Sequence, residues 1–151
     1  MRVSASLVAA AVAVAACGTP KLKSGGGVEL VPAPPGDVAA LVRSELARAA
    51  RDGKQLLVYD GATWCEPCRR FHQAAEEHRL DRDFPGLRLL VFDDDRDGPR
   101  LAAAGYAGKY IPLFVRPGAD GRSSGRQVEG SVKGDGAVGE IVPRLRALLS
   151  P

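Results

Sequence analysis

Two cysteines separated by Glu66 and Pro67 constrain the fold of this chain more than any other feature of its sequence. Cys65 and Cys68 follow shortly after a compact apolar run at 56–58, which is typical of a buried strand. Proline is tolerated in the first turn of a helix, where its missing N–H would have had no partner. This order predicts a strand, a short loop and then a helix that begins near the first cysteine.

A thiol at the start of a helix is chemically reactive. Unpaired backbone N–H groups and the positive end of the helix dipole both stabilise a thiolate, so we expect the pKa of the Cys65 thiol to fall below its usual value. Glu66 opposes this shift, but a solvated charge is screened. Cys68 lies about one helical turn further on and can reach the first sulfur. We therefore expect Cys65 to attack disulfides and Cys68 to resolve the mixed disulfide.

A zinc site and a structural disulfide are alternative uses of the same two cysteines. A zinc site would need His72 and His78, but on one helix these lie about 9 Å apart along the axis and on different faces. A structural disulfide that closes so short a loop stabilises a fold little. We therefore expect no metal, and no cofactor besides a redox-active Cys65–Cys68 disulfide. The two histidines are interpreted as solvated helix residues.

The rest of the chain predicts an α/β fold in which helices cover both faces of a central mixed β-sheet. Strands and helices alternate after Asp37, which is expected to cap the first helix, and a hairpin and a closing helix follow. The last helix begins either near Ile141, or near Asp135 with a bend at Pro143. The expected helices are 38–49, 64–78, 100–106 and one that ends at 149, and the expected strands are 55–59, 87–92, 110–115 and 127–129.

The N-terminal part is predicted to be a signal peptide followed by a flexible tether. Residues 1–16 have the pattern of a secretory signal peptide, with Arg2 at the start, an apolar Ala/Val run and small residues at the end. The run is too short for a convincing membrane span, which needs about 20 apolar residues. Residues 17–36 mix Gly, Pro, Ser and Lys and are expected to form a flexible tether that could include a short strand at 28–31. Residues 37–151 are expected to be the folded domain.

The segment Val14-Ala15-Ala16-Cys17 resembles the lipobox of bacterial lipoproteins. In that family the chain is cut before the cysteine, which becomes the lipidated first residue, so the resemblance implies that Cys17 carries lipid. Each buried methylene of such a lipid contributes about 0.8 kcal/mol to membrane binding. A lipidated Cys17 also explains the odd number of cysteines, which is three. The alternative is an ordinary cleaved signal peptide in which Cys17 is incidental.

The segment Ala62-Thr63-Trp64-Cys65-Glu66-Pro67-Cys68 resembles the active-site motif of the thioredoxin family, particularly its membrane-tethered, extracytoplasmic members of cytochrome c maturation. Downstream, Lys109-Tyr110-Ile111-Pro112 looks like the family's cis-proline loop, which packs beside the redox cysteines. A proline inside a strand-like run also favours a special backbone such as a cis bond. The resemblance implies a thioredoxin-like fold, with Trp64 at the rim of the site and with Ile111 and Pro112 docking extended substrate backbone.

The sequence also departs from the thioredoxin pattern. Thioredoxins usually have a buried carboxylate six residues before the first cysteine, and here that position is Tyr59. Asp60 follows it and is expected to point to the opposite face, because side chains alternate along a strand. Asp93 or Glu66 could relay the proton instead, although residues 93–95 are more simply interpreted as a solvated strand end and helix approach. The segment after the cysteines lacks the Glu-Phe-Pro-like pattern common in cytochrome-maturation members.

These features predict an enzyme, a thiol–disulfide oxidoreductase that exchanges electrons with protein thiols and disulfides through a mixed disulfide. We expect a reductase, because Glu66-Pro67 resembles reducing members, and a membrane electron donor would then supply it. The expected state is a monomer on the periplasmic side, lipid-anchored to a bacterial membrane. The alternative is a thioredoxin-fold binding or scaffold lipoprotein without essential redox activity. A formal net charge of only +3, with no basic stripe interleaved with aromatics, gives no support to nucleic-acid binding.

Overall fold

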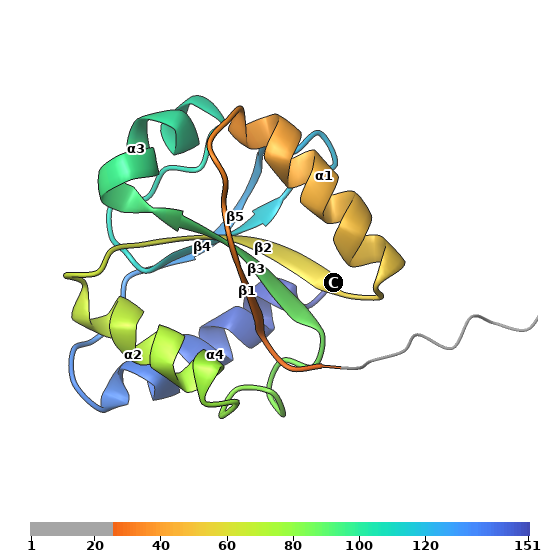
Figure 1. The fold of residues 1–151 in the computed structure, drawn as a ribbon. Helices are drawn as coiled ribbons and strands as arrows, with labels where there is room; N and C mark the ends of the chain where they lie inside the picture. The colour runs from red at the N-terminus through yellow and green to blue at the C-terminus, as the bar shows by residue number, and fades with distance from the viewer. Residues whose placement is uncertain (1–25) are drawn as a thin grey trace, which may run out of the picture.

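The computed structural model describes residues 26–151, so the predicted signal peptide and Cys17 lie outside the described residues. In this part of the chain, four helices cover the faces of a five-stranded sheet (Figure 1). The strands are β1 (Glu29–Pro32), β2 (Gln55–Gly61), β3 (Leu87–Asp93), β4 (Leu113–Pro117) and β5 (Ser123–Glu129). The helices are α1 (Val38–Arg51), α2 (Glu66–Glu76), α3 (Asp94–Ala103) and α4 (Gly136–Leu149). The expected α/β class is confirmed.

The sheet is mixed, with the strand order β1-β3-β2-β4-β5. The first three strands of this order are parallel, whereas β4 is antiparallel to β2 and β5 is antiparallel to β4. Tyr59 of the central strand β2 lies between Val91 of β3 and Phe114 of β4. Since β2 and β3 run in the same direction, their carboxyl ends meet at one edge, and the cysteine loop follows β2 there.

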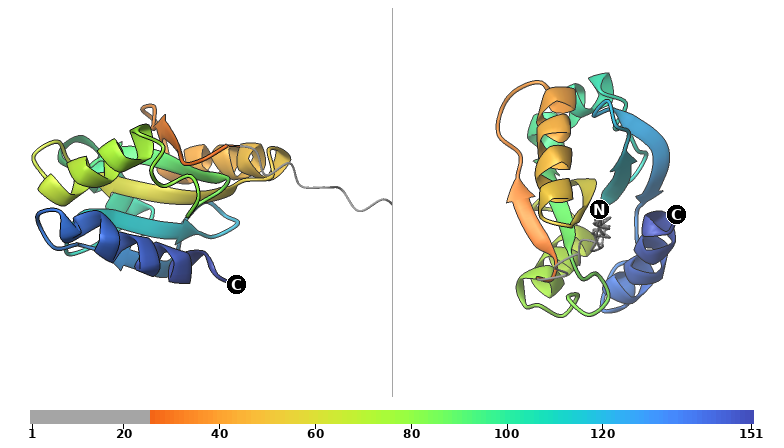
Figure 2. Two further views of the ribbon diagram at one scale, coloured as in Figure 1. Left: turned by 90° about the horizontal axis from the view of Figure 1, so that it is seen from below. Right: turned by 90° about the vertical axis from the view of Figure 1, so that its right-hand side faces the viewer.

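Alternate residues of β2 face two separate hydrophobic cores. Leu56 and Val58 pack with residues of α1 and α3, whereas Leu57 and Tyr59 pack with residues of α2 and α4. The two views of Figure 2 show these helix pairs on opposite sides of the sheet. Asp37 caps α1 as expected, because its side chain accepts a hydrogen bond from the Ala40 N–H at 2.7 Å.

The folded part begins earlier than the expected boundary at residue 37. The short strand considered at 28–31 is present as β1, an edge strand in parallel register with β3 that places Leu30 opposite Leu89, so residues 29–32 belong to the sheet. The apolar Leu30 and Val31 pack against the two cores. Lys54 Nζ donates to Glu29 Oε2 at 2.8 Å and links the strand to the start of β2. The burial of these few side chains overrides the flexible composition around them.

The expected start of the third helix near residue 100 is wrong, because α3 already begins at Asp94. The side chain of Asp93 caps this helix by accepting a hydrogen bond from the Arg96 N–H at 3.2 Å. Three aspartates lie in the first turn, where negative charge is favourable. Pro99 lies inside the helix and not at its start, so the proline was a misleading signal for the helix boundary.

The other boundaries shift by a few residues. α4 begins at Gly136 and contains Pro143, which agrees with the longer of the two expected forms of this helix. β4 begins at Leu113, after the cis bond between Ile111 and Pro112, and β5 begins at residue 123, four residues before the expected start. Within residues 26–151 no helix combines the length and the apolar character that crossing a membrane requires.

Candidate active site

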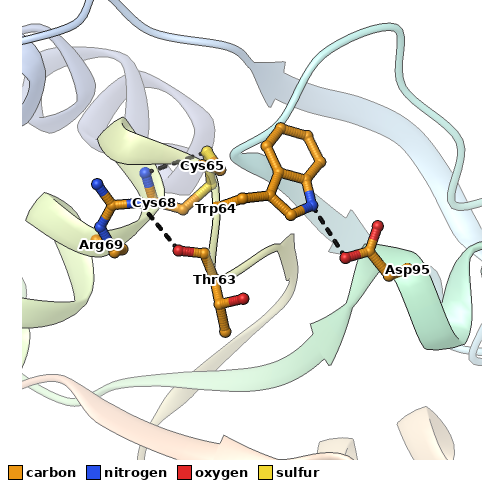
Figure 3. Close-up of a disulfide and its surroundings, with 6 residues drawn as sticks. All are labelled: Thr63, Trp64, Cys65, Cys68, Arg69 and Asp95. Carbon is orange, nitrogen blue, oxygen red and sulfur yellow. Dashed lines mark hydrogen bonds between the residues drawn. A yellow bond between two sulfur atoms is a disulfide. The ribbon is translucent and has the colours of Figure 1, made fainter.

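The two cysteines form a disulfide at the start of α2. Their sulfur atoms are bonded at 2.10 Å and their Cα atoms are 5.2 Å apart (Figure 3). Cys65 is the N-cap residue of α2, and its Sγ accepts a hydrogen bond from the Cys68 N–H at 3.3 Å. Pro67 lies in the first turn, as predicted. Both cysteines are buried, Cys68 more completely at 2% exposed. The sulfur of Cys65 is thus held where the helix N-terminus stabilises a thiolate.

Two hydrogen bonds hold the loop in front of the disulfide. The indole Nε1–H of Trp64 donates to Asp95 Oδ2 of α3 at 2.9 Å, and Arg69 donates to the Thr63 carbonyl at 2.9 Å (Figure 3). The Trp64 side chain is nevertheless 62% exposed, so its ring forms part of the surface beside Cys65. The structure therefore places the exposed Trp64 side chain next to the disulfide.

The bond between Ile111 and Pro112 is cis, as expected. Ile111 packs against a small buried cluster of Ala62, Cys65 and Cys68, so the loop before β4 lies directly beside the disulfide. The Pro112 carbonyl accepts a hydrogen bond from the Gly130 N–H at 2.9 Å. The structure thus brings together the two parts of the predicted site, which are more than forty residues apart in the sequence.

Glu66 is bound to groups other than the sulfurs. Its carboxylate accepts hydrogen bonds from the guanidinium of Arg70 and, at 2.9 Å, from the Gly134 N–H. The hydrogen bond from Arg70, followed by that from Gly134, lowers the pKa of Glu66. A carboxylate held in this way ties α2 to the loop before α4 and is a weak base. This argues against the proton-relay role that we considered for Glu66.

Cys68 also lines a cavity of about 370 Å³. It is lined by Cys68, Tyr59 and Gly61, by His72, Gln73 and Glu76 of α2, and by residues of β3 and α3 that include Asp93 and Arg96. His72 is half-buried here, and burial lowers its pKa. The interpretation of His72 as a solvated residue is therefore wrong, whereas His78 has a side chain that is 77% exposed, in agreement with it.

Comparisons with known proteins point to one fold. No family model matches the chain. A curated H-type thioredoxin from Populus jackii is 39% identical over 51 residues, which are 34% of this chain and 35% of that protein. Wild-type thioredoxin h from poplar superposes with a TM-score of 0.50 at 28% identity, over 83% of this chain and 99% of that chain. Oxidized thioredoxin O1 from Arabidopsis thaliana gives 0.46 at 21% identity, over 83% and 100%.

The fold of this chain is thioredoxin-like. The chain spans about a third of the length of the curated relative that it matches, so the resemblance to that relative is local in sequence. The likeness to the poplar structure, in contrast, extends over nearly the whole of that chain. The fold, the cysteine pair at the start of α2 and the cis bond before β4 are together the thioredoxin-like core of the molecule.

Within this thioredoxin-like core, Tyr59 and Asp60 differ from each other in their surroundings. Tyr59 is 1% exposed and packs against Phe71, His72 and Phe114, and its hydroxyl has no hydrogen-bond partner among the described residues. Burial raises the pKa of Tyr59 far above its usual range, with a smaller contribution from Asp60, so the phenol stays neutral. A neutral hydroxyl therefore occupies the position at which the thioredoxin pattern has a carboxylate, as the sequence indicated.

Asp60 lies on the opposite face, among acidic residues of α3. It is 4% exposed, and burial together with the nearby carboxylate of Asp94 raises the pKa of Asp60 to about 7. Smaller contributions come from Asp97 and Asp93. Tyr59 packs in the core formed with α2 and α4, so Asp60, the next residue of β2, points to the opposite face of the sheet, as predicted. Asp60 itself does not line the cavity that Cys68 lines.

The described residues 26–151 contain no group of three or more His, Cys, Asp or Glu side chains that could hold a metal ion. The burial of His72 was not predicted from the sequence, because it depends on the walls of the cavity, which come from β2, β3 and α3. The only local signal was its position four residues after Cys68, which places both side chains on one face of the helix.

Proposed function

We propose that this chain is a thiol–disulfide oxidoreductase that acts on protein disulfides outside the cytoplasm. The single observation that carries the proposal is the Cys65–Cys68 disulfide at the N-terminus of α2, with the cis-proline loop beside it. The similarity to poplar thioredoxin h supports it. A helix N-terminus stabilises the thiolate form of a capping cysteine, and this is the form that attacks disulfides.

The reaction that this geometry supports has two steps. In the dithiol form, the Cys65 thiolate attacks one sulfur of a substrate disulfide, forms a mixed disulfide and releases the first substrate thiolate. The Cys68 thiol then loses its proton and its sulfur attacks Cys65, which reforms the Cys65–Cys68 disulfide and releases the second substrate thiolate. The enzyme loses two electrons and the substrate gains two, and water protonates the released thiolates.

The surface beside the cysteines suits an extended polypeptide. The three large apolar side chains that stand out as exposed in the described residues are Trp64, Tyr110 and Val132. Tyr110 and Val132 line a hollow of about 410 Å³ next to Ile111, and Trp64 precedes Cys65. Exposed apolar residues around a reactive thiol favour a protein substrate over a small polar thiol. The family role proposed for Ile111 and Pro112, docking substrate backbone, agrees with this placement.

The proposal also includes the direction of electron transfer and the location of the protein in the cell. We propose a reductase, supported by the resemblance of Glu66-Pro67 to reducing members, with a membrane electron donor restoring the dithiol. The signal-like residues 1–16 and the lipobox-like segment that ends at Cys17 support an extracytoplasmic, lipid-anchored protein. Residues 18–28 would then link the anchor to β1. Labelled fatty acid should enter the chain in a bacterial host, and Cys17→Ala should abolish this incorporation.

A trapping experiment tests the activity. Cys68→Ser leaves Cys65 able to attack but removes the group that resolves the mixed disulfide, so the variant should retain substrate proteins through a bond that dithiothreitol breaks. Cys65→Ser is the matched control and should capture none. If the Cys68→Ser variant captures nothing, and a chain with both cysteines changed to alanine keeps its biological function, the oxidoreductase proposal is wrong. The protein would then be a binding or scaffold lipoprotein.

A further inference from the structure

The Cys68 thiol must gain and lose a proton in each turnover, but it is almost completely buried. Its side chain is 2% exposed, so bulk water does not reach it directly. The cavity of about 370 Å³ that it lines is the space through which a proton can travel. Its lining is largely apolar but includes the polar side chains of Tyr59, His72 and Gln73, and a cavity of this size has room for several water molecules. The groups that line it therefore determine how the proton moves.

We infer that His72 exchanges the proton of Cys68 across this cavity, an inference that rests on the proposed oxidoreductase function. His72 follows Cys68 by four residues in α2, so the two side chains lie on one face of the helix about one turn apart, and both line the cavity. The imidazole lines the cavity and is only half-buried, so it can exchange a proton both with the cavity and with solvent. His72 takes up the proton through cavity water and does not contact the sulfur atoms. It is therefore a positioning residue, which acts on Cys68 through the cavity.

Tyr59 supports this role with a hydroxyl that has no other use. Its ring lies against the imidazole of His72, with 5.0 Å between the ring centres, and its hydroxyl has no partner among the described residues. A side chain at Gly61 would meet this hydroxyl at 2.4 Å, which shows that the oxygen lies directly over the backbone of Gly61, another cavity residue. A buried hydroxyl without a partner is costly unless water satisfies it. The Tyr59 hydroxyl is therefore suited to hold a water molecule in the cavity.

His72 is in the protonation state that the step requires. Burial lowers its pKa below the ordinary value, and the nearby Glu76 opposes this only in part, so the imidazole is neutral at neutral pH and can accept a proton. The charged groups that face it are Arg69 and Glu76 of α2, Asp93 of β3 and Arg96 of α3. Arg69 donates to the Thr63 carbonyl, and Arg96 donates to Asp97 at 2.9 Å.

The other acidic groups near the site are less suitable. Glu66 is held by Arg70 and Gly134, and Asp60 is on the opposite face of the sheet. Asp93 lines the cavity, but its carboxylate already caps α3. Its backbone N–H is also held, by Asp97 Oδ2 at 3.0 Å. Glu76 also lines the cavity, but it lies two helical turns from Cys68 at the end of α2, whereas His72 lies one turn away and combines a neutral base with access to the surface.

The proton step balances as follows. While the substrate is bound to Cys65 as a mixed disulfide, the proton of the Cys68 thiol passes through cavity water to the His72 imidazole. The Cys68 thiolate then attacks the Cys65 sulfur, so that the intramolecular S–S bond forms and the bond to the substrate breaks. The substrate leaves as a thiolate, and His72 releases its proton to solvent. When a donor reduces the disulfide again, the same path returns a proton to Cys68.

A single-turnover experiment isolates this step. The full chain is reduced, with Cys17→Ser so that only the pair reacts, and is mixed with one equivalent of a chromogenic aryl disulfide. The first aryl thiolate reports attack by Cys65 and the second reports resolution by Cys68. We expect the rate of the second release to rise with pH through a midpoint below the ordinary histidine pKa. In His72→Gln this release should be at least about tenfold slower at pH 7, with its midpoint moved up toward that of a thiol.

Matched variants separate this inference from the proposed function. His78→Gln changes an exposed histidine just beyond α2 and should leave both releases unchanged. Asp93→Asn should leave the midpoint in place, and a loss of the midpoint in that variant would overturn the assignment to His72. An unchanged profile in His72→Gln would also overturn it. A parent chain that releases only one equivalent would instead contradict the oxidoreductase proposal itself.

A measurement without a variant gives an independent check. NMR titration of the His72 imidazole should give different pKa values in the disulfide and dithiol forms, because the cavity gains a thiol proton on reduction. The ring resonances of the exposed His78 at a fixed pH should be the same in both forms. Identical His72 titrations in the two forms would overturn the inference even if His72→Gln failed to fold.

Discussion

The backbone N–H of Cys68 donates a hydrogen bond to the sulfur of Cys65, with 3.3 Å between nitrogen and sulfur. The attacking sulfur therefore caps the helix that also carries the resolving cysteine. In the dithiol form the same N–H is directed at a thiolate, and a charged acceptor strengthens such a hydrogen bond. The start of α2 thus stabilises the Cys65 thiolate and also positions Cys68, which resolves the mixed disulfide.

The hydrogen bond between Trp64 and Asp95 should immobilise the indole ring. Trp64 is the one tryptophan of the chain and is mostly exposed, so little else holds it. Asp95→Ala should lower the steady-state fluorescence anisotropy of Trp64 while changing the free energy of unfolding by less than about 1 kcal/mol, as is usual for an exposed contact. Glu77→Ala, at the far end of α2, is the control and should leave the anisotropy unchanged. Equal anisotropy in the Asp95→Ala variant and the parent chain would show that the hydrogen bond does not hold the ring.

Asp60 should make the protein less stable as the pH rises. Its pKa is raised to about 7 by burial and by Asp94, so the folded chain binds a proton that the unfolded chain releases near pH 4. Stability from this group is therefore complete at low pH and is lost as the pH rises from about 4 to about 7. Asp60→Asn should stabilise the protein at pH 8 by about 1–3 kcal/mol, and the gain should disappear near pH 4.

Urea unfolding at several pH values measures this difference. Asp120→Asn, in the exposed turn between β4 and β5, is the matched control and should show no comparable dependence on pH. An Asp60→Asn variant that is less stable than the parent at pH 8 would contradict the assignment of a raised pKa.

Asp97 should have the opposite pH dependence. It is 2% exposed and accepts hydrogen bonds from Arg96, from Arg100 and from the Asp93 N–H. The hydrogen bond from Arg96 is the main cause that lowers its pKa to about 2. Its stabilising contribution is therefore present above about pH 4 and is lost as the pH falls toward 2. Asp97→Asn should cost about 2 kcal/mol at pH 7 by thermal or urea unfolding, and the cost should shrink as the pH approaches 2. If Asp97→Asn destabilises the protein by the same amount down to pH 2, the charge of the Asp97 carboxylate does not stabilise the fold.

The parts of the fold that local patterns encode were predictable. The apolar run at 56–58, the cysteine pair with Pro67 and the helix cap at Asp37 each act over a few residues, and each is found as expected. The cis bond at Pro112 was also predictable, because a proline in a strand-like run needs an unusual backbone. These local signals suffice to place the attacking and resolving cysteines and the loop beside them.

The parts that depend on contacts between distant segments were not predictable. A short strand at 28–31 was considered, but its place at the edge of the sheet, parallel to β3, has no signal in the Gly/Pro-rich stretch around it. α3 begins at Asp94 because Asp93 caps it, whereas Pro99 had suggested a later start. The cavity beside Cys68 combines residues of α2, β2, β3 and α3, so the burial of His72 could not be predicted from its position four residues after Cys68 alone. Packing between elements decides these features, and composition alone does not.

The ionisation of Cys65 is the most direct test of how this site works. The rate of alkylation of Cys65 by iodoacetamide follows its thiolate fraction, and it can be measured against pH in the reduced Cys68→Ser variant with Cys17→Ser. The same variant unfolded in urea is the control, because the thiol is then free of the helix.

In the folded chain, the midpoint of the rate profile should lie at least about one pH unit below that of the unfolded chain, as helix N-termini produce. Coincident midpoints in the folded and unfolded chains would contradict a thiolate stabilised at the start of α2.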